Sequence, residues 1–80
     1  MTREQRQQIL RDVVQSFGKL EWFRDAAVYD SHPLTGEPTL EIKVNYIPIF
    51  DRKYVLDFAM RVNLSLKFTE VDRNGKPKEA

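Results

Sequence analysis

In the second half of this sequence the spacing of apolar residues changes from every second residue to helical spacing and back again. This pattern limits the possible folds more than any other feature of the sequence. Apolar and polar side chains alternate over residues 40–46, apolar side chains recur at helical spacing over residues 55–62, and alternation returns over residues 64–71. Period two is typical of a strand with one buried face, and a period near 3.6 is typical of a helix packed on one side. A strand, helix and strand in succession cross over with a right hand, so the two strands are expected to run parallel.

The first half begins with a helix predicted over residues 3–17. Its apolar side chains recur on one face, at Ile9, Leu10, Val13, Val14 and Phe17. Thr2, with Gln5 three residues later, is a capping-box pattern for the start of a helix. Gly18 follows the last apolar position, where a left-handed C-terminal cap is expected.

A hairpin is predicted after this helix. The apolar residues 26–29 are expected to form a short first strand, and residues 31–38, which contain two prolines and a glycine, to form a loop. The strand over residues 40–46 then completes the hairpin.

The second helix is predicted over residues 51–62. Asp51 is expected to be its N-cap, with Phe50 and Val55 packed together as a hydrophobic staple. Its inward stripe is expected to be Val55, Phe58, Ala59 and Val62. Asn63 is expected to adopt the left-handed conformation that ends the helix.

These elements predict an α+β fold, a two-layer sandwich of αββαβ order with a three-stranded mixed sheet and two helices on one face. The inward face of the sheet is expected to carry Leu40, Ile42, Val44, Leu64, Leu66 and Phe68. The outward face is expected to meet water through Thr39, Glu41, Lys43, Asn45, Ser65, Lys67 and Thr69. One domain over residues 1–71 and a flexible polar tail over residues 72–80 are predicted, while the order of strands in the sheet stays open.

Composition excludes several classes of function. The chain has 80 residues, 13 Lys plus Arg against 12 Asp plus Glu, no cysteine and one histidine, His32. Its length allows one core and no second domain, and the absence of cysteine excludes a disulfide framework and a thiolate nucleophile. Neither a targeting segment nor a membrane-length apolar stretch is visible, so a cytoplasmic chain is expected.

One loop brings titratable side chains together in sequence, namely Asp30, Ser31, His32, Thr35 and Glu37. A histidine between carboxylates is a pattern used for proton transfer or metal binding. A metal site needs three or four ligands and a triad needs a nucleophile beside its base, whereas these residues lie on a long loop. Local hydrogen bonding is therefore the favoured interpretation, and we expect no enzyme activity, no metal and no cofactor.

Binding to nucleic acid is the alternative function. The outward sheet face would supply Lys43, Asn45, Lys67 and Tyr29 for contacts with phosphates and bases. The element order resembles that of type II KH domains, but the Gly-x-x-Gly loop that clamps phosphates in that family is absent from residues 47–53. Basic and acidic residues are interspersed along the chain, so binding of this kind is expected to be weak.

The favoured function is a small interaction or accessory module that binds a protein partner or a second copy of itself. Its candidate interface consists of Ile47, Ile49, Phe50, Leu56 and Met60. Leu56 and Met60 lie far from the inward stripe of their helix, so either a partner covers them or the first helix or the aromatic pair Trp22 and Phe23 does. Pairing of a free sheet edge across a two-fold axis would give a homodimer.

Overall fold

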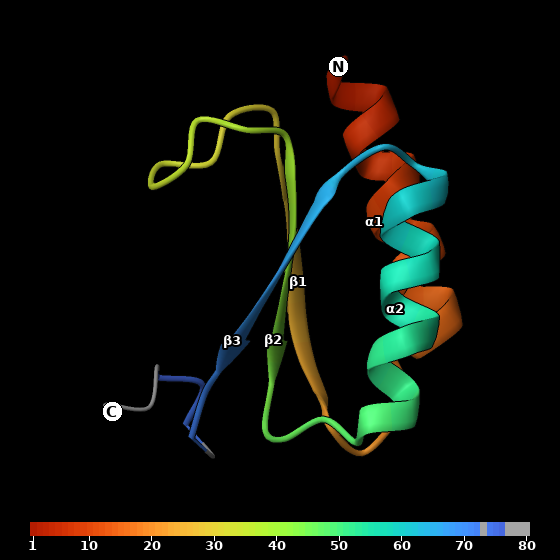
Figure 1. Ribbon diagram of the computed structural model, residues 1–80, viewed down its shortest axis with the longest axis vertical. Coiled ribbons are helices and arrows are strands. Elements are labelled where there is room, and N and C mark those ends of the chain that lie inside the picture. The colour runs from red at the N-terminus through yellow and green to blue at the C-terminus, as the bar shows by residue number, and fades with distance from the viewer. Residues whose placement is uncertain (73, 77–80) are drawn as a thin grey trace.

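The computed structural model describes residues 1–72 and 74–76 and contains the predicted elements in the predicted order (Figure 1). They are α1 (Arg3–Phe17), β1 (Phe23–Tyr29), β2 (Thr39–Val44), α2 (Ile49–Arg61) and β3 (Ser65–Glu70). The strands form one mixed sheet in the order β1-β2-β3, with β1 antiparallel and β3 parallel to β2. The predicted α+β fold with a three-stranded mixed sheet is therefore confirmed, and the open question of strand order is answered.

Both helices cover the same face of the sheet, α1 beside β1 and α2 beside β3 (Figure 1). Ile42 of the central strand pairs with Ala26 on one side and Phe68 on the other, and its side chain is fully buried. The core between the layers follows the predicted inward face of β2 and the predicted inward stripe of α2. Its most deeply buried members are Val13, Leu40, Ile42, Val44, Val55 and Ala59.

The bounds of α1 and its N-terminal capping box are as predicted, but the conformation of its C-terminal cap is not. Thr2 Oγ1 accepts a hydrogen bond of 3.1 Å from the Gln5 amide, and Gln5 Oε1 accepts one of 2.8 Å from the Thr2 amide. Gly18 does not adopt the left-handed conformation, because its φ is −63° and its ψ is −21°. Glycine is favoured there for a different reason, since a Cβ at this position would overlap the carbonyl oxygen of Val14.

The start of α2 also differs from the prediction. The helix begins at Ile49 with Pro48 as its N-cap, and the Pro48 carbonyl accepts hydrogen bonds from the amides of Asp51 and Arg52. Asp51 therefore lies inside the first turn and is not the cap. The predicted staple is absent too, because Phe50 points outward and is 83% exposed, whereas Val55 is fully buried.

The strands differ from the predicted ranges by up to three residues at their ends. Asn63 has a φ of 59°, so the predicted left-handed residue after α2 is confirmed. β1 begins at Phe23, earlier than expected, and an irregularity in its pairing lies between Phe23 and Asp25.

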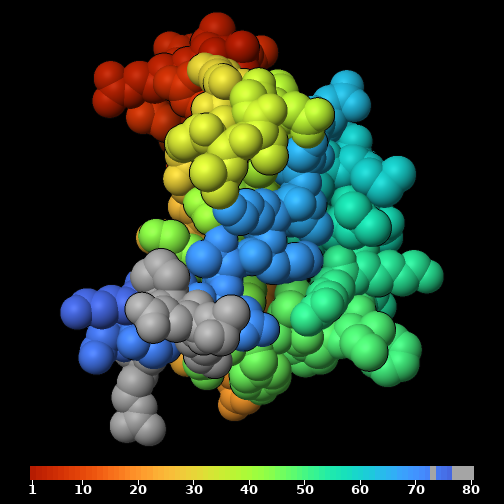
Figure 2. All heavy atoms as spheres, turned by 60° about the vertical axis from the view of Figure 1, so that its left-hand side comes forward, coloured from red at the N-terminus to blue at the C-terminus, as the bar shows by residue number. Residues whose placement is uncertain are grey.

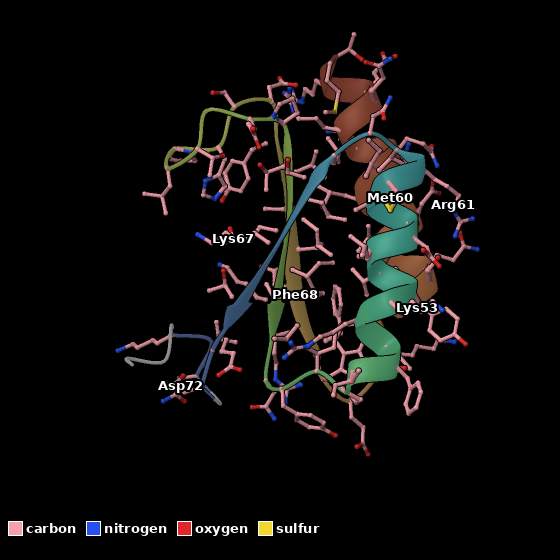
Figure 3. All side chains as sticks on the ribbon, viewed as in Figure 1. Lys53, Met60, Arg61, Lys67, Phe68 and Asp72 are labelled. Carbon is pink, nitrogen blue, oxygen red and sulfur yellow. The ribbon has the colours of Figure 1, made fainter. Side chains whose placement is uncertain are left out.

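The outward face of the sheet is less open than predicted. Thr39 and Glu41 were expected to meet water, but they are buried, with exposed fractions of 3% and 8%. Both lie on the central strand between neighbours on β1 and β3, and the loop over residues 31–38 projects from the sheet on the side away from the helices (Figures 1 and 2). Lys67 points outward on this face, while Phe68 points toward the helices (Figure 3).

The predicted tail is described only in part. Asp72 and Lys76 are joined by a backbone hydrogen bond of 2.7 Å, and Asp72 Oδ1 accepts hydrogen bonds from the amides of Asn74 and Lys76. The described part of the tail is thus a hydrogen-bonded turn, and the prediction of flexibility at Arg73 and residues 77–80 lies outside the described residues.

Candidate functional site

The outer side of α2 carries a group of large apolar side chains that the rest of the described chain does not cover. We call this group the α2 surface; it consists of Ile49 (81% exposed), Phe50 (83%), Tyr54 (65%), Leu56 (47%) and Met60 (66%). At 3.6 residues per turn, Ile49, Leu56 and Met60 lie within about 40° of one another on the helix. Phe50 and Tyr54 form a second line, roughly 80–160° further round the helix, and the core residues Val55 and Ala59 lie about 100° from the first line on its other side.

Four of the five interface residues predicted from the sequence lie on this surface, and one does not. Ile47 precedes the helix and is only 8% exposed, as a member of the core, so it is not available to a partner. Coverage by α1 or by the pair Trp22 and Phe23 was the alternative for Leu56 and Met60, but both side chains stay partly exposed, so neither is covered fully. Sequence reasoning missed Tyr54, although its spacing of four residues from Phe50 places it on the same side of the helix.

A groove lies beside this surface, between α1 and α2. Its volume is about 560 Å³, and its lining residues come from both helices and the turn that follows α1. Its apolar part is an aromatic cluster, in which the Phe17 ring centroid lies 6.2 Å from that of Trp22 and 6.0 Å from that of Phe58. The Trp22 indole Nε1 donates a hydrogen bond of 2.8 Å to Asp51 Oδ2, which ties the turn to the first turn of α2.

The charged lining of this groove is mostly acidic. Asp12 comes from α1, and Asp51, Asp57 and Arg61 come from α2. Arg61 and Lys53 extend from the same side of α2 in Figure 3. In the part of the chain that the structure describes, the salt bridges all involve Asp30, so no cation pairs with the three groove carboxylates.

A second polar cluster lies on the outward face of the sheet, around Glu41. Its Oε1 accepts a hydrogen bond of 3.2 Å from the Tyr29 hydroxyl, and its Oε2 accepts one of 2.5 Å from the Thr69 hydroxyl. These bonds join all three strands across one face. A buried carboxylate needs hydrogen bonds to offset its lost hydration, and Tyr29 and Thr69 supply them. The stability of the fold is therefore enough to explain why these residues lie together.

The environment of this cluster shifts two pKa values. Burial alone raises the pKa of the Glu41 carboxyl, but the hydrogen bonds from Thr69 and Tyr29 and the attraction of Lys67 and His32 outweigh it, so the pKa lies below 4.5. The pKa of the Tyr29 hydroxyl is raised above 10.0, first by burial and then by the charge and hydrogen bond of Glu41. The carboxylate and the protonated phenol therefore stabilise each other.

The loop residues considered for catalysis do not form one site. Asp30 pairs with the Arg6 guanidinium and, at 3.5 Å, with the N-terminal amine, while Glu37 accepts a hydrogen bond from the Ser65 hydroxyl. His32 is buried, with its ring edge-on to Tyr29 at 5.0 Å and its Nδ1 accepting a hydrogen bond from the Leu34 amide. Of the other two loop residues, the Ser31 hydroxyl donates to the Gly36 carbonyl and Thr35 Oγ1 accepts from the Glu37 amide. No group of three potential metal ligands occurs among the residues described.

The residues considered for nucleic-acid binding share the outward face but are engaged with the chain itself. Tyr29 is held by Glu41 and His32, and Lys67 interacts electrostatically with Glu41. The Asn45 backbone N–H donates a hydrogen bond of 2.9 Å to the Trp22 carbonyl, and Lys43 is partly buried.

No protein-family model, curated protein or solved structure compared with this chain matches it. Within residues 1–72 and 74–76, neither helix has the length and apolar character needed to cross a membrane. The features of the chain that bear on its function are the α2 surface and the adjoining groove.

Proposed function

We propose that this chain is a non-enzymatic protein-interaction module and that a partner protein binds to the α2 surface. The observation that supports this proposal is the exposure of five large apolar side chains on one short helix. Apolar side chains exposed singly are common on soluble proteins, whereas neighbouring ones, here Ile49, Leu56 and Met60 on one line of the helix and Phe50 and Tyr54 on another, are typical of a binding surface. Phe, Tyr and Met are also enriched in the buried centres of interfaces.

The same surface has no structural role that would explain its composition. Val55, Ala59, Phe58 and Val62 already supply the contacts of α2 with the sheet and with α1. Replacement of Ile49 or Met60 by a polar residue is therefore expected to change the free energy of unfolding by less than about 0.5 kcal/mol. The proposal includes action in the cytoplasm, as expected from the sequence, which cell fractionation tests.

The test is affinity capture with the double variant Ile49→Asn/Met60→Gln. Tagged wild type is expected to retain a protein partner from a lysate of its source cells, with or without nuclease, and the double variant is expected to lose it. Leu34→Asn is the matched control, because Leu34 is 79% exposed but lies in the loop on the other side of the sheet. Sedimentation equilibrium of the pure protein shows whether the partner is a second copy.

Three results would contradict the proposal. One is retention of the same partner by the double variant, and another is loss of the partner in the Leu34→Asn control. The third is retention that disappears with nuclease treatment, which would favour the nucleic-acid alternative on the outward sheet face.

A further inference from the structure

The groove between α1 and α2 is long enough to hold a short helical segment of a partner. Its α2 wall runs from Asp51 to Arg61, which corresponds to about 15 Å of helix. Its volume of about 560 Å³ lies within the range of specific ligand sites. Two packed helices also present ridges and grooves against which a third helix can pack.

Apolar side chains are available for contact inside this groove. Leu20 is 41% exposed and Tyr54 is 65% exposed, and Phe58, which also lines the groove, is partly buried. Tyr54 belongs to both the groove and the α2 surface, so a partner that contacts Phe50 and Tyr54 can also reach the groove. A ligand with apolar side chains on one face would cover these groups.

Charge indicates the chemistry of that ligand. The groove holds three carboxylates, Asp12, Asp51 and Asp57, and one cation, Arg61. Asp12 accepts a hydrogen bond from the neutral Gln8 amide and Asp51 from the neutral Trp22 indole, so neither negative charge is compensated there. Because the whole chain has a net charge of +1, this negative potential is local to the groove and is not a general property of the protein.

We propose that the groove binds a basic amphipathic helix of the partner protein, with apolar side chains on Leu20, Tyr54 and Phe58 and with Lys or Arg side chains beside the three carboxylates. This inference rests on the proposed function and specifies the chemistry of the partner. A helix fits better than an extended strand because the groove walls are helices and offer no free strand edge for backbone pairing. Apolar residues at spacings of three and four would then contact the groove floor.

The experiment uses Trp22 as a built-in reporter, because it is the one tryptophan of the chain and lines the groove. Uniformly 15N-labelled protein is titrated with a peptide of about 14 residues in which leucines at helical spacing are separated by lysines. The Trp22 indole resonance is expected to shift with saturation. A peptide with glutamate in place of each lysine is expected to bind at least roughly tenfold more weakly.

Charge-reversal variants locate the site. Asp12→Lys/Asp57→Lys is expected to weaken binding of the lysine peptide by roughly tenfold. Asp25→Lys/Glu70→Lys makes the same change in net charge at exposed positions outside the groove and is expected to weaken it less than about threefold. Thermal unfolding of each variant establishes that it is folded.

Equal affinity for the lysine and glutamate peptides would overturn the inference. Equal effects of the two double variants, or binding without a shift of the Trp22 indole, would overturn it too. If the inference fails in one of these ways while Ile49→Asn/Met60→Gln still loses its captured partner, the proposed function stands and only the assignment of a basic helix falls.

Discussion

The Trp22 indole donates its N–H to Asp51 across the groove, so the turn after α1 and the first turn of α2 are held together by one hydrogen bond of 2.8 Å. Trp22 is almost fully buried, and the acceptor is a carboxylate. A hydrogen bond to a charged group contributes more to stability than one between neutral groups, and loss of one partner leaves the other unsatisfied. This contact therefore links the geometry of the groove to the stability of the fold.

Asp51→Ala is expected to lower the free energy of unfolding by about 2 kcal/mol, because it leaves the buried indole N–H without its acceptor. The control is Asp57→Ala on the same helix, which removes an exposed carboxylate and is expected to cost less than about 0.5 kcal/mol. Urea unfolding measures both. Equal losses in the two variants would show that the Trp22 contact adds nothing.

Glu41→Gln is expected to make stability less sensitive to acid. The folded state lowers the pKa of Glu41, so its carboxylate contributes stability above the ordinary pKa of 4.5, and this contribution is lost as the pH falls from there through the lower folded value. Wild type should therefore lose stability below pH 4.5 more steeply than Glu41→Gln. Urea unfolding between roughly pH 3 and pH 7 measures this.

The matched control for Glu41 is Glu21→Gln, at an exposed position outside the cluster. It should retain the wild-type dependence on pH. If Glu41→Gln loses stability in acid as steeply as wild type does, the hydrogen bonds from Tyr29 and Thr69 do not hold the carboxylate in its charged form.

The elements of this fold could be predicted because each carries its own local signal. The capping box at Thr2, the alternation along β2 and the left-handed Asn63 depend on residues close in sequence. The start of α2 was harder, since Pro48 and Asp51 both favour a helix N-terminus. The Asp51 carboxylate does not cap the helix; it accepts a hydrogen bond from Trp22, which is 29 residues away in sequence.

The candidate site was predictable only where a helical wheel describes it. Ile49, Leu56 and Met60 follow from their spacing in one helix, but Ile47 belongs to the same apolar run and is buried. The groove depends on how α1 and α2 lie side by side, and no local pattern contains that information. The burial of Glu41 likewise depends on strands and a loop that meet it from other parts of the chain.

Gly18→Ala is expected to destabilise the protein by more than about 1 kcal/mol, although alanine normally suits a right-handed backbone better than glycine does. The reason is steric, because the added Cβ would overlap the Val14 carbonyl oxygen that accepts the Gly18 amide hydrogen bond. Thermal unfolding measures the change. An unchanged or higher melting temperature would mean that the turn relaxes without cost.

His32→Ala is expected to loosen the loop over residues 31–38 while leaving the α2 surface intact. The buried imidazole packs on Tyr29 and accepts the Leu34 amide, and an aromatic contact of this kind contributes about 1 kcal/mol. In the wild type, the backbone amides of His32 and Gly36 bond to the carbonyls of Glu37 and His32. Hydrogen exchange at these two backbone positions should become faster in the variant. Leu34→Ala changes an exposed side chain of the same loop and should leave exchange unchanged.

Partner capture by His32→Ala should match that of the wild type, because the loop lies on the opposite side of the sheet from α2. Loss of capture would place the loop in the interface.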